Sequence, residues 1–265
     1  MYVKRKCSFH SGDLRVFPAR FCYRWLLCCC WFFWGCMNAG AAFAAEVSNA
    51  KGGFLDFNLY PYLSDVPSDN SFTLNMATNL PNRISYFGFI NLSNQADRGE
   101  LGDLAGYYTE QNIRWQLREN SVFDATLQYN TKSGNDNDKL RLGVRWRASD
   151  SGFLKPFFNA LSLKWSVNFH VLQFDDDERR AWQIEHAFAL SFPYLSDRLY
   201  LAGFVDHNIN ETLGPSVPKN PVVAEAQLGF RLIENFFVVA EYRLNEYRTS
   251  DVNNLAVGFE YKMKW

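Results

Sequence analysis

The feature that most constrains the fold is a strict two-residue alternation from Asn254 to Trp265. Apolar residues occupy one set of alternate positions, and small or charged residues occupy the other: Leu255, Val257, Phe259, Tyr261, Met263 and Trp265 against Ala256, Gly258, Glu260, Lys262 and Lys264. Side chains of a β-strand alternate between its two faces, so the stretch predicts a strand with one apolar face. It is longer than most strands of soluble domains and matches a tilted strand that crosses a bilayer.

Alternating segments of the same kind recur along the chain, separated by turn-type residues. We predict eleven more, at 54–62, 71–80, 83–92, 107–118, 121–131, 138–148, 160–174, 180–192, 198–208, 221–232 and 235–247. Connections after even-numbered segments are mostly short, whereas those after odd-numbered segments are mostly longer and polar, notably 93–106 and 209–220. The connection 148–159 breaks this rule, and the sequence offers no reason for it. Short turns at one end and long loops at the other are typical of outer-membrane barrels.

The predicted fold class is therefore all-β, a 12-stranded antiparallel transmembrane β-barrel. A secreted β-sandwich is the alternative, although its strands would usually be shorter. The last segment resembles the terminal strand of bacterial outer-membrane barrels, which closes the barrel and carries its assembly signal. The resemblance implies two partners, outer-membrane lipid and the barrel assembly machinery, the second recognising the strand that ends at Trp265. The expected location is the bacterial outer membrane.

The N-terminal residues differ from the rest. A basic region from Lys4 to Arg24 precedes an apolar block, Trp25–Phe43, so residues 1–45 predict a signal peptide cleaved after Ala44 or Ala45, and 46–265 the barrel. A lipoprotein signal or an uncleaved anchor are alternatives. All 6 cysteines fall in this segment, which excludes a disulfide scaffold and a thiolate metal site in the mature chain. The segment contains six of the 27 basic residues of the chain and one of its 28 acidic residues, Asp13. Its removal leaves 21 basic and 27 acidic residues, and this net charge of −6 argues against nucleic-acid binding.

Residues opposite the apolar faces predict the lining of the barrel. Its candidate pore-lining or solute-binding members are Phe87, Phe89, Glu110, Arg114, Arg141, Arg145, Lys164, Asn168, His170, Glu185, Phe204, Asp206, Glu225, Gln227, Glu241 and Arg243. For Phe87 and Phe89 the phase is open, because both could instead face lipid. Barrels of about eight strands are filled by side chains, and those of about sixteen leave an aqueous channel. Two readings follow: a salt-bridged filling, or a channel in which small residues such as Gly229 and Gly258 leave room.

The segments RISYFGFINLSNQ, LYLAGFVDHN, VVAEAQLGF and FVVAEYRLNEY resemble those of the Tsx-type nucleoside-specific channel-forming proteins of the outer membrane. The resemblance extends over nearly the whole mature chain as a pattern with scattered motifs. It implies a non-enzymatic channel for passive diffusion of a small polar solute, which could be a nucleoside, without a cofactor or metal. A plugged structural barrel is one alternative. The other is an outer-membrane lipid hydrolase that uses Ser166 and His170, which share a face in one segment.

Overall fold

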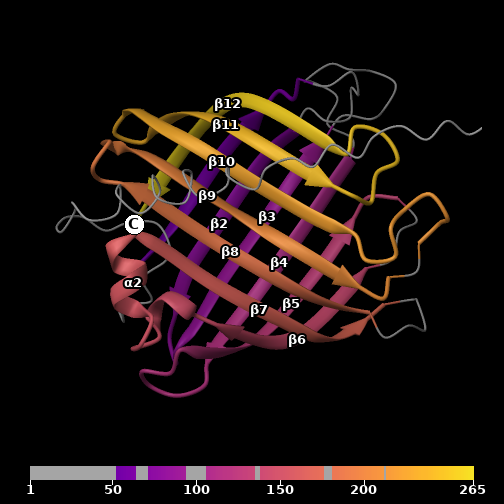
Figure 1. The fold of residues 1–265 in the computed structure, drawn as a ribbon, viewed down its shortest axis with the longest axis horizontal. Coiled ribbons are helices and arrows are strands. Elements are labelled where there is room, and N and C mark those ends of the chain that lie inside the picture. The colour runs from indigo at the N-terminus through magenta and orange to yellow at the C-terminus, as the bar shows by residue number, and fades with distance from the viewer. Residues whose placement is uncertain (1–51, 64–70, 94–105, 135–137, 176–180, 212) are drawn as a thin grey trace, which may run out of the picture. The chain divides into compact units, whose positions relative to one another are not determined.

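The computed structural model describes residues 52–63, 71–93, 106–134, 138–175, 181–211 and 213–265. These residues form twelve β-strands in a closed antiparallel barrel, in which neighbours in sequence pair and the first strand pairs with the last (Figure 1). The strands are β1 (Gly53–Tyr60), β2 (Ser71–Leu80), β3 (Ile84–Ser93), β4 (Gly106–Gln116), β5 (Phe123–Lys132), β6 (Lys139–Trp146), β7 (Leu163–Phe174), β8 (Trp182–Phe192), β9 (Ser196–Ile209), β10 (Val222–Ile233), β11 (Phe236–Asn245) and β12 (Asn253–Lys264). The predicted all-β barrel is confirmed, whereas the predicted signal peptide lies outside the described residues.

The barrel closes along the pairing of β1 with β12. Their register runs from Phe54 opposite Lys264 to Leu59 opposite Phe259. Beyond it, the backbone N–H of Gly53 donates to the Trp265 carbonyl at 3.1 Å, and the Trp265 N–H donates back at 3.2 Å. Closure satisfies backbone groups that would otherwise form two exposed sheet edges.

The two faces differ sharply in exposure in strands such as β5 and, most clearly, β12. Exposed and buried residues alternate there from Asn253 to Lys262, with the apolar side chains outside and Glu260 and Lys262 inside. The buried interior of the described barrel is rich in carboxylates, amides and guanidinium groups, whereas its outer face carries large exposed apolar side chains. This arrangement inverts that of a water-soluble domain.

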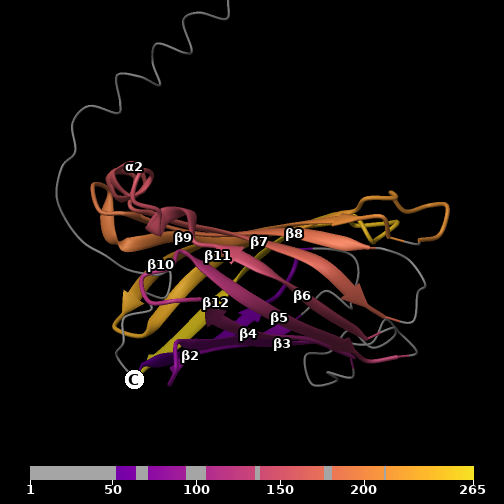
Figure 2. The ribbon, with the colours of Figure 1, turned by 90° about the horizontal axis from the view of Figure 1, so that it is seen from below.

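The exceptional connection between β6 and β7 is folded. It contains the 3-10 turn η2 (Ala148–Asp150) and the short helix α2 (Lys155–Ala160), which lie at the same end of the barrel as the C-terminus (Figures 1 and 2). Phe158 of α2 is buried and contacts Trp165 edge-on, with ring centroids 6.3 Å apart. Because α2 continues to Ala160, the seventh strand, expected from about residue 160, begins three residues later as β7 at Leu163. No helix in the described ranges is long and apolar enough to span a membrane.

A bulge changes the face pattern near the end of β7. Leu142 of β6 is opposite Leu172 and Gly143 is opposite His170, so Val171 is an extra residue. Val171 and Leu172 both face outward, 59% and 52% exposed, and Gln173 returns to the interior. One additional residue therefore brings an amide inside that strict alternation would place elsewhere.

Candidate functional site

Strand register places all the predicted lining residues on the interior face. Directly opposed residues of neighbouring strands share a face. Phe87 is opposite Asn112 and Phe89 is opposite Glu110, and both partners are buried, so the two phenylalanines point inward. The same register relations put the charged and polar candidates inside. Lys164, opposite Ala189, lies near the short-turn end of β7.

Some interior charges form direct ion pairs. Asp124, whose side chain is 1% exposed, contacts Arg145 at 2.5 Å and Arg147 at 3.1 Å. Arg243 contacts Glu225 at 2.7 Å, and its second nitrogen lies 3.7 Å from Glu241. These groups stabilise one another within the wall, so they behave as structural members of the interior.

A third paired group lies around Lys262. Its ammonium is 2.6 Å from Glu260 and 3.8 Å from Asp56, and it stands over the ring of Tyr200. Lys262 therefore joins β12 to β1 by charge and to β9 by a cation–π contact.

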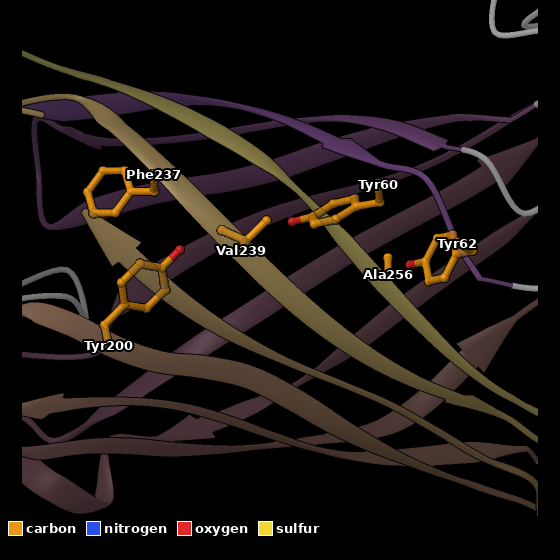
Figure 3. Close-up of a cluster of buried hydrophobic side chains, with 6 residues drawn as sticks. All are labelled: Tyr60, Tyr62, Tyr200, Phe237, Val239 and Ala256. Carbon is orange, nitrogen blue, oxygen red and sulfur yellow. The ribbon is translucent and has the colours of Figure 1, made fainter. Parts of the chain in front are cut away.

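Tyrosines brace the side of the barrel formed by β9 to β12 and β1. The Tyr60 hydroxyl donates to Gln227 on β10, and the Tyr200 hydroxyl donates to Glu260 on β12. Each bond joins strands three positions apart in the barrel. Gln227 in turn donates to the Tyr200 hydroxyl at 2.5 Å. Figure 3 shows these tyrosine rings inside the barrel, with Tyr200 beside Phe237, at a centroid distance of 5.7 Å.

This brace corrects one expectation. In the channel reading of the sequence, Gly229 and Gly258 leave open space in the lumen. A Cβ on Gly229 would lie 2.1 Å from Cε1 of Tyr200, so the tyrosine ring occupies that space. A Cβ on Gly258 would lie 1.9 Å from the Leu59 carbonyl oxygen. Both glycines permit close packing rather than a passage.

Besides the Asp124 ion pairs on β5 and β6, the wall formed by β4 to β9 contains charges of a different kind. Within the described chain, the carboxylates Glu110 and Asp206 have no cation at ion-pair distance, and Arg114 and Arg141 have no carboxylate there. The one cation candidate that the described residues offer Glu185 at this distance is His170, whose Nε2 lies 3.3 Å from its Oε2. The unpaired groups are still close enough to interact electrostatically across the interior.

Neutral amides connect these unpaired charges. Gln128 accepts from Arg141 at 2.7 Å and donates to Glu185 at 3.4 Å and to Asn112 at 3.3 Å. Asn112 donates to Glu110 at 2.8 Å. A single carboxamide thus separates the Arg141 cation from the Glu185 anion.

Several buried polar atoms on this wall lack a hydrogen-bond partner among the described residues. They include acceptors on three residues, Asn168 Oδ1, Gln183 Oε1 and Asp206 Oδ1, together with His170 Nδ1 and Arg114 Nε. Buried polar groups are normally satisfied by protein, water or a ligand, so this wall has unused capacity for hydrogen bonding.

Aromatic rings of β3 and β4 line the interior beside the unpaired charges. Phe89 contacts Phe87 at 6.3 Å and Tyr108 at 5.7 Å between ring centroids. The Arg114 guanidinium lies 5.5 Å from the Phe87 ring centroid. This cluster offers flat apolar surface next to charged groups.

A further ion pair lies at the long-loop end. Lys139 donates to the two carboxylate oxygens of Glu211 at 2.9 and 3.1 Å, joining the start of β6 to the residues after β9. Tyr247 lies close by, and its burial, together with the negative charge of Glu211, raises its pKa. The phenol therefore stays protonated near neutral pH.

The geometry does not support the hydrolase alternative. Ser166 and His170 lie four residues apart on one strand, about 13 Å at the usual rise, so they cannot share a hydrogen bond. The partner of His170 is Glu185, and both groups face the interior rather than the outer surface of the barrel.

Two kinds of interior residue were missed as candidates. Tyr60 and Tyr62 come from β1 and the residues after it, and Tyr62 donates to Glu241. Their alternation with Asn58 was a readable signal of an inward face. Gln173, which accepts from Arg141 at 2.7 Å, depends on the β7 bulge and had no such signal.

No protein-family model and no curated protein sequence matches the chain. Among solved structures, the KdgM porin is 14% identical, with 78% of this chain and 98% of that one covered and a TM-score of 0.47. The NanC porin is 9% identical, with coverage of 81% and 100% and a TM-score of 0.46. OccAB2 of Acinetobacter baumannii is 11% identical, with coverage of 84% and 66% and a TM-score of 0.34. Such similarity concerns the arrangement of strands and says nothing about a solute.

Proposed function

We propose that the protein is an outer-membrane channel through which small polar solutes diffuse passively. The outer face of the barrel supports a location in lipid. Its exposed residues include Leu255, Val257 and Phe259 on β12 and similar side chains around the barrel. An apolar surface this continuous would be unstable in water, and a bilayer accommodates it. The helical connection and the C-terminus would then lie at the periplasmic end, as short turns do in this class.

The unpaired interior charges carry the proposal of a channel. In a dry, filled interior, Glu110, Asp206, Arg114 and Arg141 would each cost several kcal/mol, because no opposite charge among the described residues lies at ion-pair distance from them. Water along the β4–β9 wall would solvate them at little cost. The ion pairs and tyrosines of the opposite wall would narrow the passage without closing it. The same interior without water would be the plugged structural barrel, which this balance of energies disfavours.

Planar-bilayer recording of the refolded barrel tests the channel directly. We expect discrete openings of small conductance in KCl. Neutralising an interior carboxylate, Glu110→Gln, should change the single-channel conductance, whereas Asp197→Asn, on a side chain 84% exposed, should not. A folded barrel that stays silent in the bilayer would reject the channel in favour of the plugged barrel.

The finer hypothesis is that the solute is a nucleoside, as the resemblance to Tsx-type channels implies. The cluster of Phe87, Phe89 and Tyr108 supports it, since aromatic rings stack on a flat base while Glu110 accepts hydrogen bonds nearby. Nucleosides should then block the ion current at lower concentration than sugars of similar size. Equal block by both classes would reject nucleoside specificity while leaving the channel in place.

A further inference from the structure

Three neighbouring strands place an unusual set of polar side chains together on the β4–β9 wall. Register sets Asn168 of β7 opposite Glu185 of β8, and Glu185 opposite Asp206 of β9. Two residues further along β7, His170 is opposite Gln183 of β8. Asn168, His170 and Gln183 are at most 2% exposed. We call these five residues the acceptor patch.

Hydrogen-bond acceptors without partners dominate the acceptor patch. Asn168 Oδ1, Gln183 Oε1 and Asp206 Oδ1 accept no hydrogen bond from the described residues. Two carboxylates, Glu185 and Asp206, also oppose each other directly on neighbouring strands, a placement that destabilises a sheet unless a positive charge offsets it. His170 is the sole cation candidate within ion-pair distance of Glu185 in the described chain. A ligand group that fits here donates several hydrogen bonds and carries positive charge, as an ammonium does.

Groups of the opposite character stand next to the acceptor patch. Gln128 contacts both Arg141, at 2.7 Å, and Glu185, at 3.4 Å, so a guanidinium lies one carboxamide away from the patch. The Nε of Arg114 is buried without a hydrogen-bond partner and interacts electrostatically with Glu185. Guanidinium groups favour carboxylates as partners.

We propose that this wall binds an amphoteric solute whose ammonium and carboxylate are carried by the same or adjacent carbons, as in an α-amino acid. The ammonium donates to Glu185, Asp206 and the neighbouring amide oxygens, and the carboxylate accepts from Arg141 and Arg114. The inference rests on the proposed channel function and names its solute class. It differs from the nucleoside hypothesis because it rests on charged groups of β4 and β6–β9 rather than on the aromatic rings of β3 and β4.

Four probes of one size separate the contributions of the two charges. Alanine carries both charges, lactate only the carboxylate, 2-aminopropan-1-ol only the ammonium, and propane-1,2-diol neither. Uptake of each labelled compound into proteoliposomes is measured at low concentration, where flux follows occupancy of the site. Because hydrogen bonds to charged groups are stronger than those between neutral groups, we expect alanine to enter on the order of tenfold faster than the diol. Lactate and the amino alcohol should fall between them.

Matched substitutions assign each charge to its protein partner. Asp206→Asn should remove the advantage of alanine over lactate and leave the advantage of lactate over the diol. Arg141→Gln should remove the advantage of alanine over the amino alcohol and leave the advantage of the amino alcohol over the diol. Asp197→Asn and Arg118→Gln make the same chemical changes at exposed positions and should alter neither ratio. Heat-modifiable migration in gels shows that each variant has folded.

The outcomes separate this inference from the channel itself. Equal uptake of the four probes by the native barrel, or uptake that follows size and net charge alone, overturns the amphoteric site while the channel stands. Selective block by nucleosides without any advantage for alanine does the same. Absence of both uptake and conductance in a folded barrel overturns the channel and this inference with it.

Discussion

At the scale of single residues, the interior of the barrel is decided by which side chains reach a partner. Tyr200 shows this clearly, because its ring lies against Gly229 and its hydroxyl contacts both Glu260 and Gln227. A glycine is needed beneath the ring, since any Cβ there would displace it. The brace on that side of the barrel therefore depends on one missing side chain.

Replacing this glycine should weaken the barrel. In Gly229→Ala the new Cβ meets Tyr200 at 2.1 Å and disrupts its hydrogen bonds, so we expect a loss of about 1–3 kcal/mol in the free energy of unfolding. Urea unfolding of the refolded protein in lipid vesicles, followed by tryptophan fluorescence, measures it. Gly214→Ala is the matched control, because its Cβ would meet nothing within 4 Å. Identical midpoints for the two variants would contradict the bracing role of Tyr200.

At the scale of elements, β12 is the strand on which closure depends, since it pairs with both β11 and β1. Trp265 lies at the end of this seam, and its ring covers Gly53, where a Cβ would lie 2.5 Å from Cζ2. The apolar face of β12 is exposed throughout, as a strand at the surface of a bilayer protein requires. The seam and the expected assembly signal thus occupy the same few residues.

Removing the terminal ring should impair assembly more than export. We expect Trp265→Ala to lower the amount of folded barrel in the outer membrane severalfold, with unfolded protein accumulating after translocation, because the expected recognition feature is lost along with the contact over Gly53. Membrane fractionation with heat-modifiability gels measures both populations. Met263→Ala, on the same outer face two residues earlier, serves as control. Assembly of the Trp265 variant at the control level would rule out this role.

At the scale of the whole molecule, the barrel has two unlike walls. On one, ion pairs and tyrosine hydroxyls satisfy each other across neighbouring strands, as for Lys262 with Glu260 and Tyr200 with Glu260. On the other, Asp124 is paired with Arg145 and Arg147, but further carboxylates and guanidinium groups stand apart, bridged by amides such as Gln128. The first wall stabilises the barrel. In the proposed channel, the second leaves charges for water and solute, so the ion current should depend mainly on the second.

Ion selectivity tests this division. Neutralising two unpaired carboxylates together, in the double variant Glu110→Gln and Asp206→Asn, leaves Arg114 and Arg141 less opposed. The reversal potential under a KCl gradient should then shift toward anion selectivity. Neutralising two exposed carboxylates instead, Asp150→Asn and Asp197→Asn, should leave it unchanged. A reversal potential that the interior double variant does not move would show that ions avoid this wall.

The strand pattern was readable in the sequence for a physical reason. A strand between lipid and a polar interior must alternate at every residue, so β12 and the inward positions of Glu110, Glu185 and Glu241 follow from local order. The connection containing α2 was not readable, because a short helix packed on Trp165 depends on tertiary contact. The Val171 bulge, which brings Gln173 inside, also has no local mark.

By itself, then, the sequence determined how many strands form, approximately where they run and most of the side chains that face inward. It left open which interior charges would meet. That depends on closure of the barrel and on the stagger of its strands, which bring residues far apart in sequence to the same height. Asp124 thereby reaches Arg145 and Arg147, while Asp206 and Arg141 find no ion-pair partner among the described residues. Whether a charge is paired is a property of three-dimensional distance, and the tertiary structure alone decided it.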